Sequence, residues 1–143
     1  MPFRILDNVA HADFAIEVTA ENVKELFQET ATAVQSLQFD LSRIKPLTKK
    51  EVRLENYTDL KELLYSFLCE IIFYKDADAL ALGSFEVEVE EVDGKFSLRA
   101  ELAGEKIDPN KHILHADIKA ITRHLLDLQR RKDKWIATVV VDV

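Results

Sequence analysis

Cysteine, glycine and proline are scarce in this chain of 143 residues, with one, three and three copies respectively. The single cysteine, Cys69, excludes a disulfide within the chain and favours a reducing compartment. So few glycines and prolines leave no segment with the composition of a flexible linker. We therefore expect residues 1–143 to form a single domain, because a chain of this length can bury one sufficient core.

Long apolar runs and an excess of positive charge are also missing. No run approaches the roughly 20 residues that cross a membrane, and the N-terminus has no signal-peptide pattern. The net charge of −7 argues against tight, direct binding to nucleic acid or to anionic membranes, because both need a basic surface. We expect a cytoplasmic protein that binds a metal ion or docks on a basic partner.

Familiar catalytic motifs are absent as well. The sequence contains no glycine-rich phosphate loop and no G-x-S-x-G nucleophile elbow. Cys69 could in principle form a thiol nucleophile with a histidine, but its position inside an expected helix favours a packing role. The glutamates among residues 86–91 could form an acidic docking stripe, although we prefer the solvent-facing side of a strand.

Hydrophobic periodicity predicts two helices and several strands. The helices are expected at 21–37 and 58–74. The strands are expected at 3–7, 14–18, 50–55, 84–92 and 95–102. Asp93-Gly94, between the last two strands, is a strong hairpin signal. Thr19 is a plausible N-cap of the first helix, and Thr58 or Asp59 can cap the second.

The C-terminal part of the chain is ambiguous. Residues 117–129 have a helix-forming composition, yet Ile118, Ala120 and Thr122 alternate with charged residues, and RRKDK predicts a turn. We interpret 117–129 and 134–142 as a second hairpin, preceded by an irregular segment at 104–116. Both faces of 134–142 are apolar, which predicts a central strand. The expected fold class is α+β, with two helices packed on a mainly antiparallel β-sheet.

Two aspartates interrupt these apolar patterns and are candidate metal ligands. Asp142 ends the apolar run of the last strand, and Asp13 precedes FAIEV. A buried, unpaired carboxylate is costly, so each aspartate either faces water at a sheet end or has a cation. Two carboxylates with backbone carbonyls, or with the terminal carboxylate at Val143, favour Ca²⁺ or Mg²⁺.

The histidines allow a different metal site. His112 and His115 have the spacing H-x-x-H, with Asp117 close by, and zinc could use them. The segment lacks cysteine ligands and the H-E-x-x-H pattern, so we prefer a solvated loop. His124 could be a hydrogen-bonded, partly buried histidine.

An ordered set of segments runs along nearly the whole chain: ADFAI, VKELFQETA, LLYSFLCEII, GEKIDPNKH, DIKAITRH and the ending VVVDV. In combination, this set resembles the archease family. Two departures stand out. The N-terminal loop is VAHAD where the family commonly has DHTAD, so His11 occupies a position where threonine is common. The second helix has Tyr65-Ser66-Phe67 where the family usually carries an acid in the middle.

The resemblance implies a function and a site. Archeases are protein cofactors of the GTP-dependent tRNA-splicing ligase RtcB, not enzymes, and they promote its guanylylation and repeated turnover. The resemblance implies a compact α+β fold and a divalent cation, Ca²⁺ first and otherwise Mg²⁺ or Mn²⁺, held by Asp13, Asp142 and a carbonyl of Val143. It marks Lys119 as functionally important, and His11 is a further candidate contact with the ligase.

Two other classes of function are open from the residues. A general chaperone or assembly factor would need an exposed apolar patch, and the sequence shows no unassigned apolar stretch. A small metal-dependent hydrolase would use Asp13, Asp142 and a histidine such as His11 to activate water. Activity without any partner protein would distinguish the hydrolase from the ligase cofactor.

Overall fold

The computed structural model describes residues 3–6 and 13–143. Within these residues the helices are α1 (Val23–Gln38) and α2 (Leu60–Asp78), and a short 3-10 helix, η1 (Leu41–Arg43), follows α1. The strands are β1 (Phe3–Leu6), β2 (Asp13–Ala20), β3 (Thr48–Tyr57), β4 (Leu80–Val92), β5 (Lys95–Lys106), β6 (Ala120–Arg131) and β7 (Lys134–Asp142). The predicted α+β class is confirmed.

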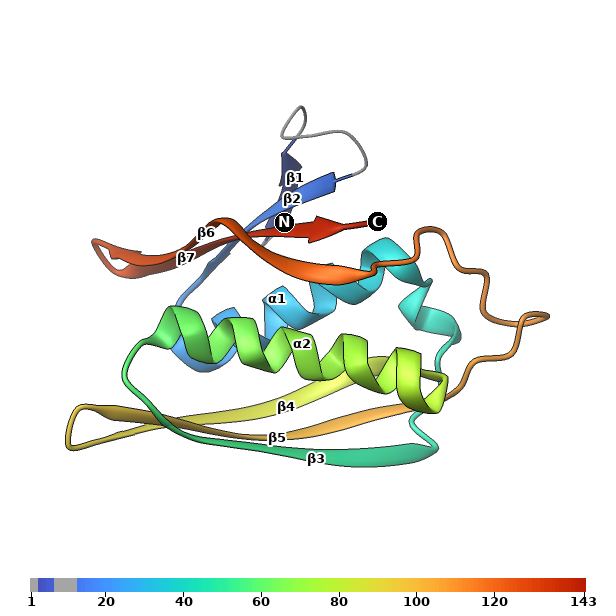
Figure 1. The fold of residues 1–143 in the computed structure, drawn as a ribbon, viewed down its shortest axis with the longest axis horizontal. Coiled ribbons are helices and arrows are strands. Elements are labelled where there is room, and N and C mark those ends of the chain that lie inside the picture. Colours follow the sequence, from blue (N-terminus) through green and yellow to red (C-terminus); the bar gives the residue numbers. More distant parts are fainter. Residues whose placement is uncertain (1–2, 7–12) are drawn as a thin grey trace.

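The strands form two antiparallel sheets, and both helices lie between them (Figure 1). The first sheet has the order β1-β2-β7-β6, and the second has the order β3-β5-β4. Each helix contacts strands of both sheets, which gives three layers with core on two sides of the helices. β7 is a central strand, as its two apolar faces predicted.

The helices are buried on more than one side because they lie between sheets. The buried apolar residues of α2 are Leu63, Leu64, Phe67, Leu68, Ile71 and Ile72. Phe67 stacks on Phe27 of α1, with the ring centroids 6.1 Å apart. Each such side chain contributes about 1.5–3 kcal/mol by leaving water, so this layer supplies much of the driving force for folding. Among the described residues, no helix has the length and apolar character that a membrane crossing requires.

The helix caps were predicted in part. Asn22, not Thr19, caps α1, and its side chain accepts a hydrogen bond from the Glu25 amide at 2.8 Å. Thr19 is instead part of β2, because that strand continues to Ala20. Asp59 caps α2 as predicted and accepts from the Lys61 amide at 2.8 Å.

Two boundaries in the C-terminal half differ from the prediction. Residues 104–106 belong to β5, so the irregular segment is 107–119. Gly104 permits this extension, because a Cβ there would come within 1.9 Å of the Ala81 carbonyl oxygen. β6 begins at Ala120. In this strand Ile121, and not Ala120, points into the core. The predicted alternation through Ala120 was therefore wrong, since Ile118 is buried before the strand begins.

The first predicted hairpin turn is confirmed. Asp93 and Gly94 have φ angles of 53° and 76°, the positive values that a type I′ turn requires at both central residues. The turn joins β4 to β5 with the right-handed twist of the flanking strands.

Candidate functional site at one end of the first sheet

The candidate ligands Asp13 and Asp142 lie opposite each other on neighbouring strands. β2 and β7 pair antiparallel, and the register places Asp13 directly across from Asp142. On its other side, Asp142 is paired with Ala120 of β6. Directly opposed residues in an antiparallel pair have Cβ atoms about 5 Å apart and side chains on the same face. The fold therefore brings together two carboxylates from opposite ends of the sequence.

Both aspartates point away from the helices. On β2 and β7 the alternate positions, which include Ile16 and Val139, belong to the core. Because side chains alternate along a strand, Asp13 and Asp142 lie on the outer face of the sheet, where both are half-buried. Like charges directly opposite each other destabilise a sheet, so a cation between these carboxylates would relieve a repulsion.

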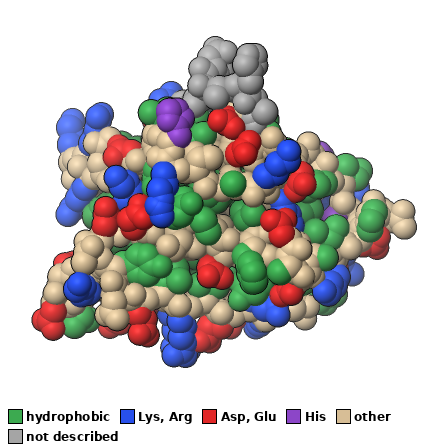
Figure 2. All heavy atoms as spheres, in the orientation of Figure 1, with side chains coloured by type: hydrophobic (Ala, Val, Ile, Leu, Met, Phe, Trp, Pro, Cys, Tyr) green, Lys and Arg blue, Asp and Glu red, His purple; other side chains and the backbone are tan. Residues whose placement is uncertain are grey.

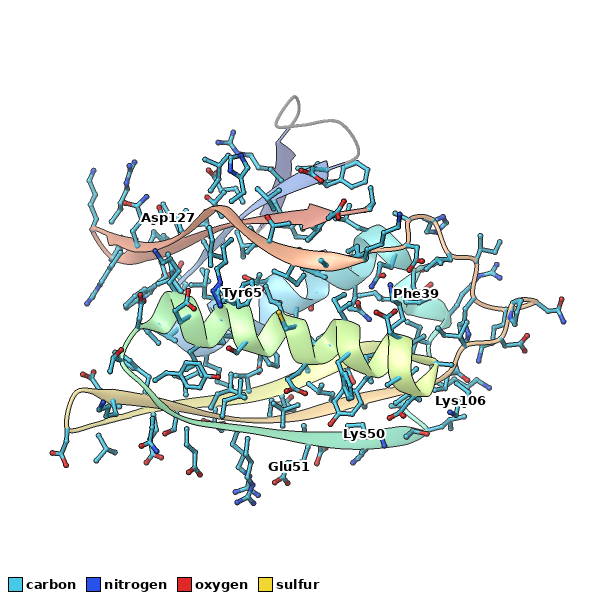
Figure 3. All side chains as sticks on the ribbon, in the orientation of Figure 1. Phe39, Lys50, Glu51, Tyr65, Lys106 and Asp127 are labelled. Carbon is cyan, nitrogen blue, oxygen red and sulfur yellow. The ribbon has the colours of Figure 1, made fainter. Side chains whose placement is uncertain are left out.

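Lys119 lies at the same end of the sheet. Its amide donates a hydrogen bond to the carbonyl oxygen of Asp142 at 2.8 Å, and the residue is exposed. It also lines a shallow groove of about 240 Å³ between α2 and β6, together with Tyr65 and Phe73. Figure 3 shows Tyr65 extending from α2 toward β6. An exposed cation and a pair of acids thus share one edge of the molecule.

The other predicted site residues are placed in part. Val143 follows β7, and its side chain packs against the core. His11 lies outside the described residues, so its role stays a prediction. In residues 3–6 and 13–143, no group of three or more histidine, cysteine, aspartate or glutamate side chains could hold a metal. Within these residues, a cation would depend on the two aspartates and on backbone oxygens.

The segment GEKIDP, residues 104–109, begins inside β5, and its Glu105 is the centre of a hydrogen-bonded cluster that we call the Glu105 clasp. The Glu105 carboxylate accepts from the Lys45 amide and the Lys111 ammonium, both at 2.7 Å, and lies 3.0 Å from Nε2 of His112. The Lys111 ammonium, then the Lys45 amide and the His112 ring, lower the pKa of Glu105 from 4.5 to about 2. On the other side of the ring, Nδ1 of His112 accepts from the Asp108 amide at 2.9 Å.

The zinc site that we considered as an alternative at His112 and His115 is not supported by these contacts. His112 is buried and both of its ring nitrogens make hydrogen bonds, while His115 is exposed. A solvated loop describes His115 but not His112, because the loop folds back and places the His112 ring against Glu105. His124 is exposed instead of partly buried.

Cys69 is half-buried beside the groove, as the packing interpretation predicted. Burial raises the pKa of its thiol, which disfavours the thiolate form. Sequence reasoning missed one feature near the site, a buried lysine on α2. Lys75 follows Ile71 and Ile72 at helical spacing, so a charge on the apolar face of the helix was the available signal.

Comparisons with known proteins agree with this architecture. The model of the Archease protein family matches residues 3–143. The protein archease of Pyrococcus furiosus is 35% identical over 133 residues, which cover 92% of this chain and 93% of that protein. The protein archease of Methanopyrus kandleri is 33% identical over the full length of both chains.

Solved structures show the same fold. The solution structure of Methanobacterium thermoautotrophicum protein 1598 has a TM-score of 0.86 and 25% identity, with 99% of each chain covered. The crystal structure of a Thermotoga maritima protein described as an archease and possible chaperone has a TM-score of 0.61 and 20% identity, with 98% of each chain covered. Since the family match and these relatives span nearly the whole chain, the protein belongs to the archease family.

Proposed function

We propose that this protein activates an RtcB-type RNA ligase in tRNA splicing or RNA repair, using a divalent cation held by Asp13 and Asp142. The proposal is supported by the position of these aspartates, directly opposite each other beside Lys119. Membership of the archease family agrees with it. In this role the protein is a cofactor of the ligase and not itself an enzyme, and it works in the cytoplasm.

The donor atoms fit a hard cation. Two facing carboxylates and a carbonyl oxygen of Val143 would hold the ion, and Ca²⁺, Mg²⁺ and Mn²⁺ all prefer oxygen ligands. When bound, the cation supplies positive charge that attracts phosphate oxygens. The packing of the Val143 side chain on the core limits the freedom of this last residue, which favours a defined position for its backbone.

Lys119 and the net charge supply the remaining elements of the proposal. The exposed Lys119 would meet an anionic group of the partner, a phosphate or a carboxylate. His11, two residues before Asp13, would contact the ligase. The net charge of −7 favours association with a basic, RNA-binding partner, because complementary potentials speed encounter.

The test is multiple-turnover RNA ligation by a cognate RtcB ligase with GTP and Mn²⁺, and with this protein at substoichiometric amounts. We expect ligation to continue past one turnover only when the protein is present, and Asp142→Asn to weaken this stimulation about tenfold or more. Asp127→Asn is the matched control, because Asp127 is an exposed aspartate of β6, away from the Asp142 end of the sheet (Figure 3). Undiminished stimulation by a folded Asp142→Asn variant would contradict the site assignment.

A general chaperone is the second candidate, because the Thermotoga maritima relative is described as a possible chaperone. Large apolar side chains are exposed at several places in the described residues, including Phe73 on α2, Ile113 and Leu114 in the irregular segment 107–119, and Leu125 on β6. A chaperone would suppress aggregation of unrelated proteins without the ligase and without metal, and Asp142→Asn would leave that activity unchanged. A metal-dependent hydrolase would instead turn over substrate alone and lose activity in the same variant.

A further inference from the structure

The side chain of Lys75 is buried in the layer between the two sheets, close to the candidate site. It is 5% exposed and comes from the last turns of α2. Its ammonium donates to Gln38 Oε1 at 2.6 Å, to the Ile118 carbonyl oxygen at 2.7 Å and to Asp117 Oδ1 at 2.5 Å. An ammonium has three N–H donors, so all three are used.

Gln38 of α1 is the second member of this polar network. Its Oε1 accepts from Lys75 and also from the Ile118 amide at 3.0 Å, and its backbone oxygen accepts from the His115 amide at 2.8 Å. Its Nε2 donates to Gln35 Oε1 at 2.7 Å, and Gln35 donates to the Leu82 carbonyl oxygen at 2.8 Å. The network therefore connects α1, α2 and β4 to the irregular segment that precedes β6.

The network ends one residue before Lys119. Ile118, which it holds through both its amide and its carbonyl oxygen, is fully buried. The next amide, that of Lys119, is bonded to the Asp142 carbonyl oxygen. A displacement of Ile118 would therefore move both the functional lysine and the backbone of a candidate metal ligand.

We propose that Lys75 is a positioning residue, whose ammonium holds Asp117 and Ile118 so that Lys119 and Asp142 keep the geometry needed for cation and partner binding. A buried ammonium is a costly way to join segments, and an apolar side chain of similar size often serves stability as well or better. Hydrogen bonds to three acceptors are directional, so they hold the backbone of residues 117–118 in a single position. An apolar side chain has no such directional contacts. The inference deepens the proposed function and rests on it for the role of Lys119.

The test compares Lys75→Met with Val52→Ala in the full-length protein. Val52 is a buried residue of β3 in the other sheet, so its truncation lowers stability without touching the network. Amide hydrogen exchange is measured without metal, followed by Tb³⁺ affinity. We expect the Lys119 and Ile118 amides to exchange about 10- to 100-fold faster in Lys75→Met than in Val52→Ala, because buried hydrogen bonds are lost locally. Tb³⁺ affinity should fall about 10- to 100-fold in Lys75→Met only.

Equal exchange and equal Tb³⁺ affinity in the two variants would overturn the inference, since a merely structural lysine affects all amides alike. Where Lys75→Met fails to fold, Asp117→Ala removes one acceptor at an exposed residue and should shift the same two readouts in the same direction. Ligase stimulation is measured last and should fall in Lys75→Met more than in Val52→Ala. If the wild-type protein does not stimulate the ligase, the proposed function fails, while exchange and Tb³⁺ affinity still decide the role of Lys75.

Discussion

Acidic residues at two places in this protein have different surroundings. Glu105 receives hydrogen bonds from the Lys45 amide and the Lys111 ammonium and lies against the His112 ring, so its charge is balanced within the chain. Asp13 and Asp142 instead face each other across two strands. The first arrangement is a closed structural clasp, whereas the second places two like charges opposite each other, which is why we proposed a cation there.

The Glu105 clasp predicts an acid-sensitive contribution to stability. Because the folded-state pKa of Glu105 is lowered from 4.5 to about 2, its contribution is present above about pH 4.5 and is lost as the pH falls toward 2. We expect Glu105→Gln to lower the melting temperature at pH 7 and to match wild type near pH 2. Thermal melts across this range measure the effect, with Glu86→Gln, an exposed glutamate of β4, as control. A difference from wild type that persists at pH 2 would argue against this clasp.

At the scale of single elements, the backbones of β4 and β5 come into close contact at Gly104. β4 and β5 pair along their length, and their register shifts between Leu82 and Ser84, opposite Gly104. Without a side chain, Gly104 lets the strands approach and lets β5 continue to Lys106, just before the segment that leads to Lys119. This glycine is needed for close approach, whereas Gly94 is needed for its positive φ.

Gly104→Ala should therefore be much more destabilising than Gly94→Ala. The added Cβ at residue 104 would lie 1.9 Å from a backbone oxygen. We therefore expect the free energy of unfolding to fall by about 3 kcal/mol. At Gly94 nothing lies within 4 Å of the added Cβ, so only the positive φ costs about 1 kcal/mol. Urea denaturation of both variants measures the difference. If both variants lose the same free energy of unfolding, the prediction is wrong, because β4 would then be able to move away from β5 at little cost.

At the scale of the whole molecule, the helix layer separates two charged surfaces. The candidate site lies on the first sheet, while Glu86, Glu88 and Glu90 are exposed on β4 of the second sheet, as the solvent-facing interpretation predicted. Arginines lie among these glutamates, and Arg53 and Arg99 line the same shallow hollow as Glu88 and Glu90. Figure 2 shows acidic and basic side chains mixed along the lower edge of the molecule, where β3 and β5 lie.

We predict that replacing Glu86, Glu88 and Glu90 together by glutamine leaves maximal ligase stimulation unchanged, because this face is on the far side of the helices from Asp142. The protein concentration that gives half-maximal stimulation should rise only a few-fold, because the long-range attraction to a basic partner becomes weaker. High salt should remove this difference, since it screens long-range attraction. A loss of maximal stimulation would identify these glutamates as the docking stripe that we considered as the alternative.

Local patterns were sufficient for much of the fold. The apolar spacing of α1 and α2, the Asp93-Gly94 turn and the two apolar faces of β7 each depend on neighbouring residues, and each was predicted from the sequence. Asp13 and Asp142 were selected by the same means, because a carboxylate interrupts an apolar pattern visibly. The pattern alone left two possibilities for them, a solvent-facing sheet end or a cation, and the family resemblance favoured the cation.

Long-range contacts determined the rest. The division into two sheets, the register that sets Asp13 opposite Asp142, and the burial of His112 and Lys75 all join residues that are distant in the sequence or folded back by a loop. Periodicity reports which face of an element is apolar, but not which element covers it. Amino-acid order thus sets the elements and their apolar faces, whereas the place of each charge depends on packing, since only packing determines which donors and acceptors surround it.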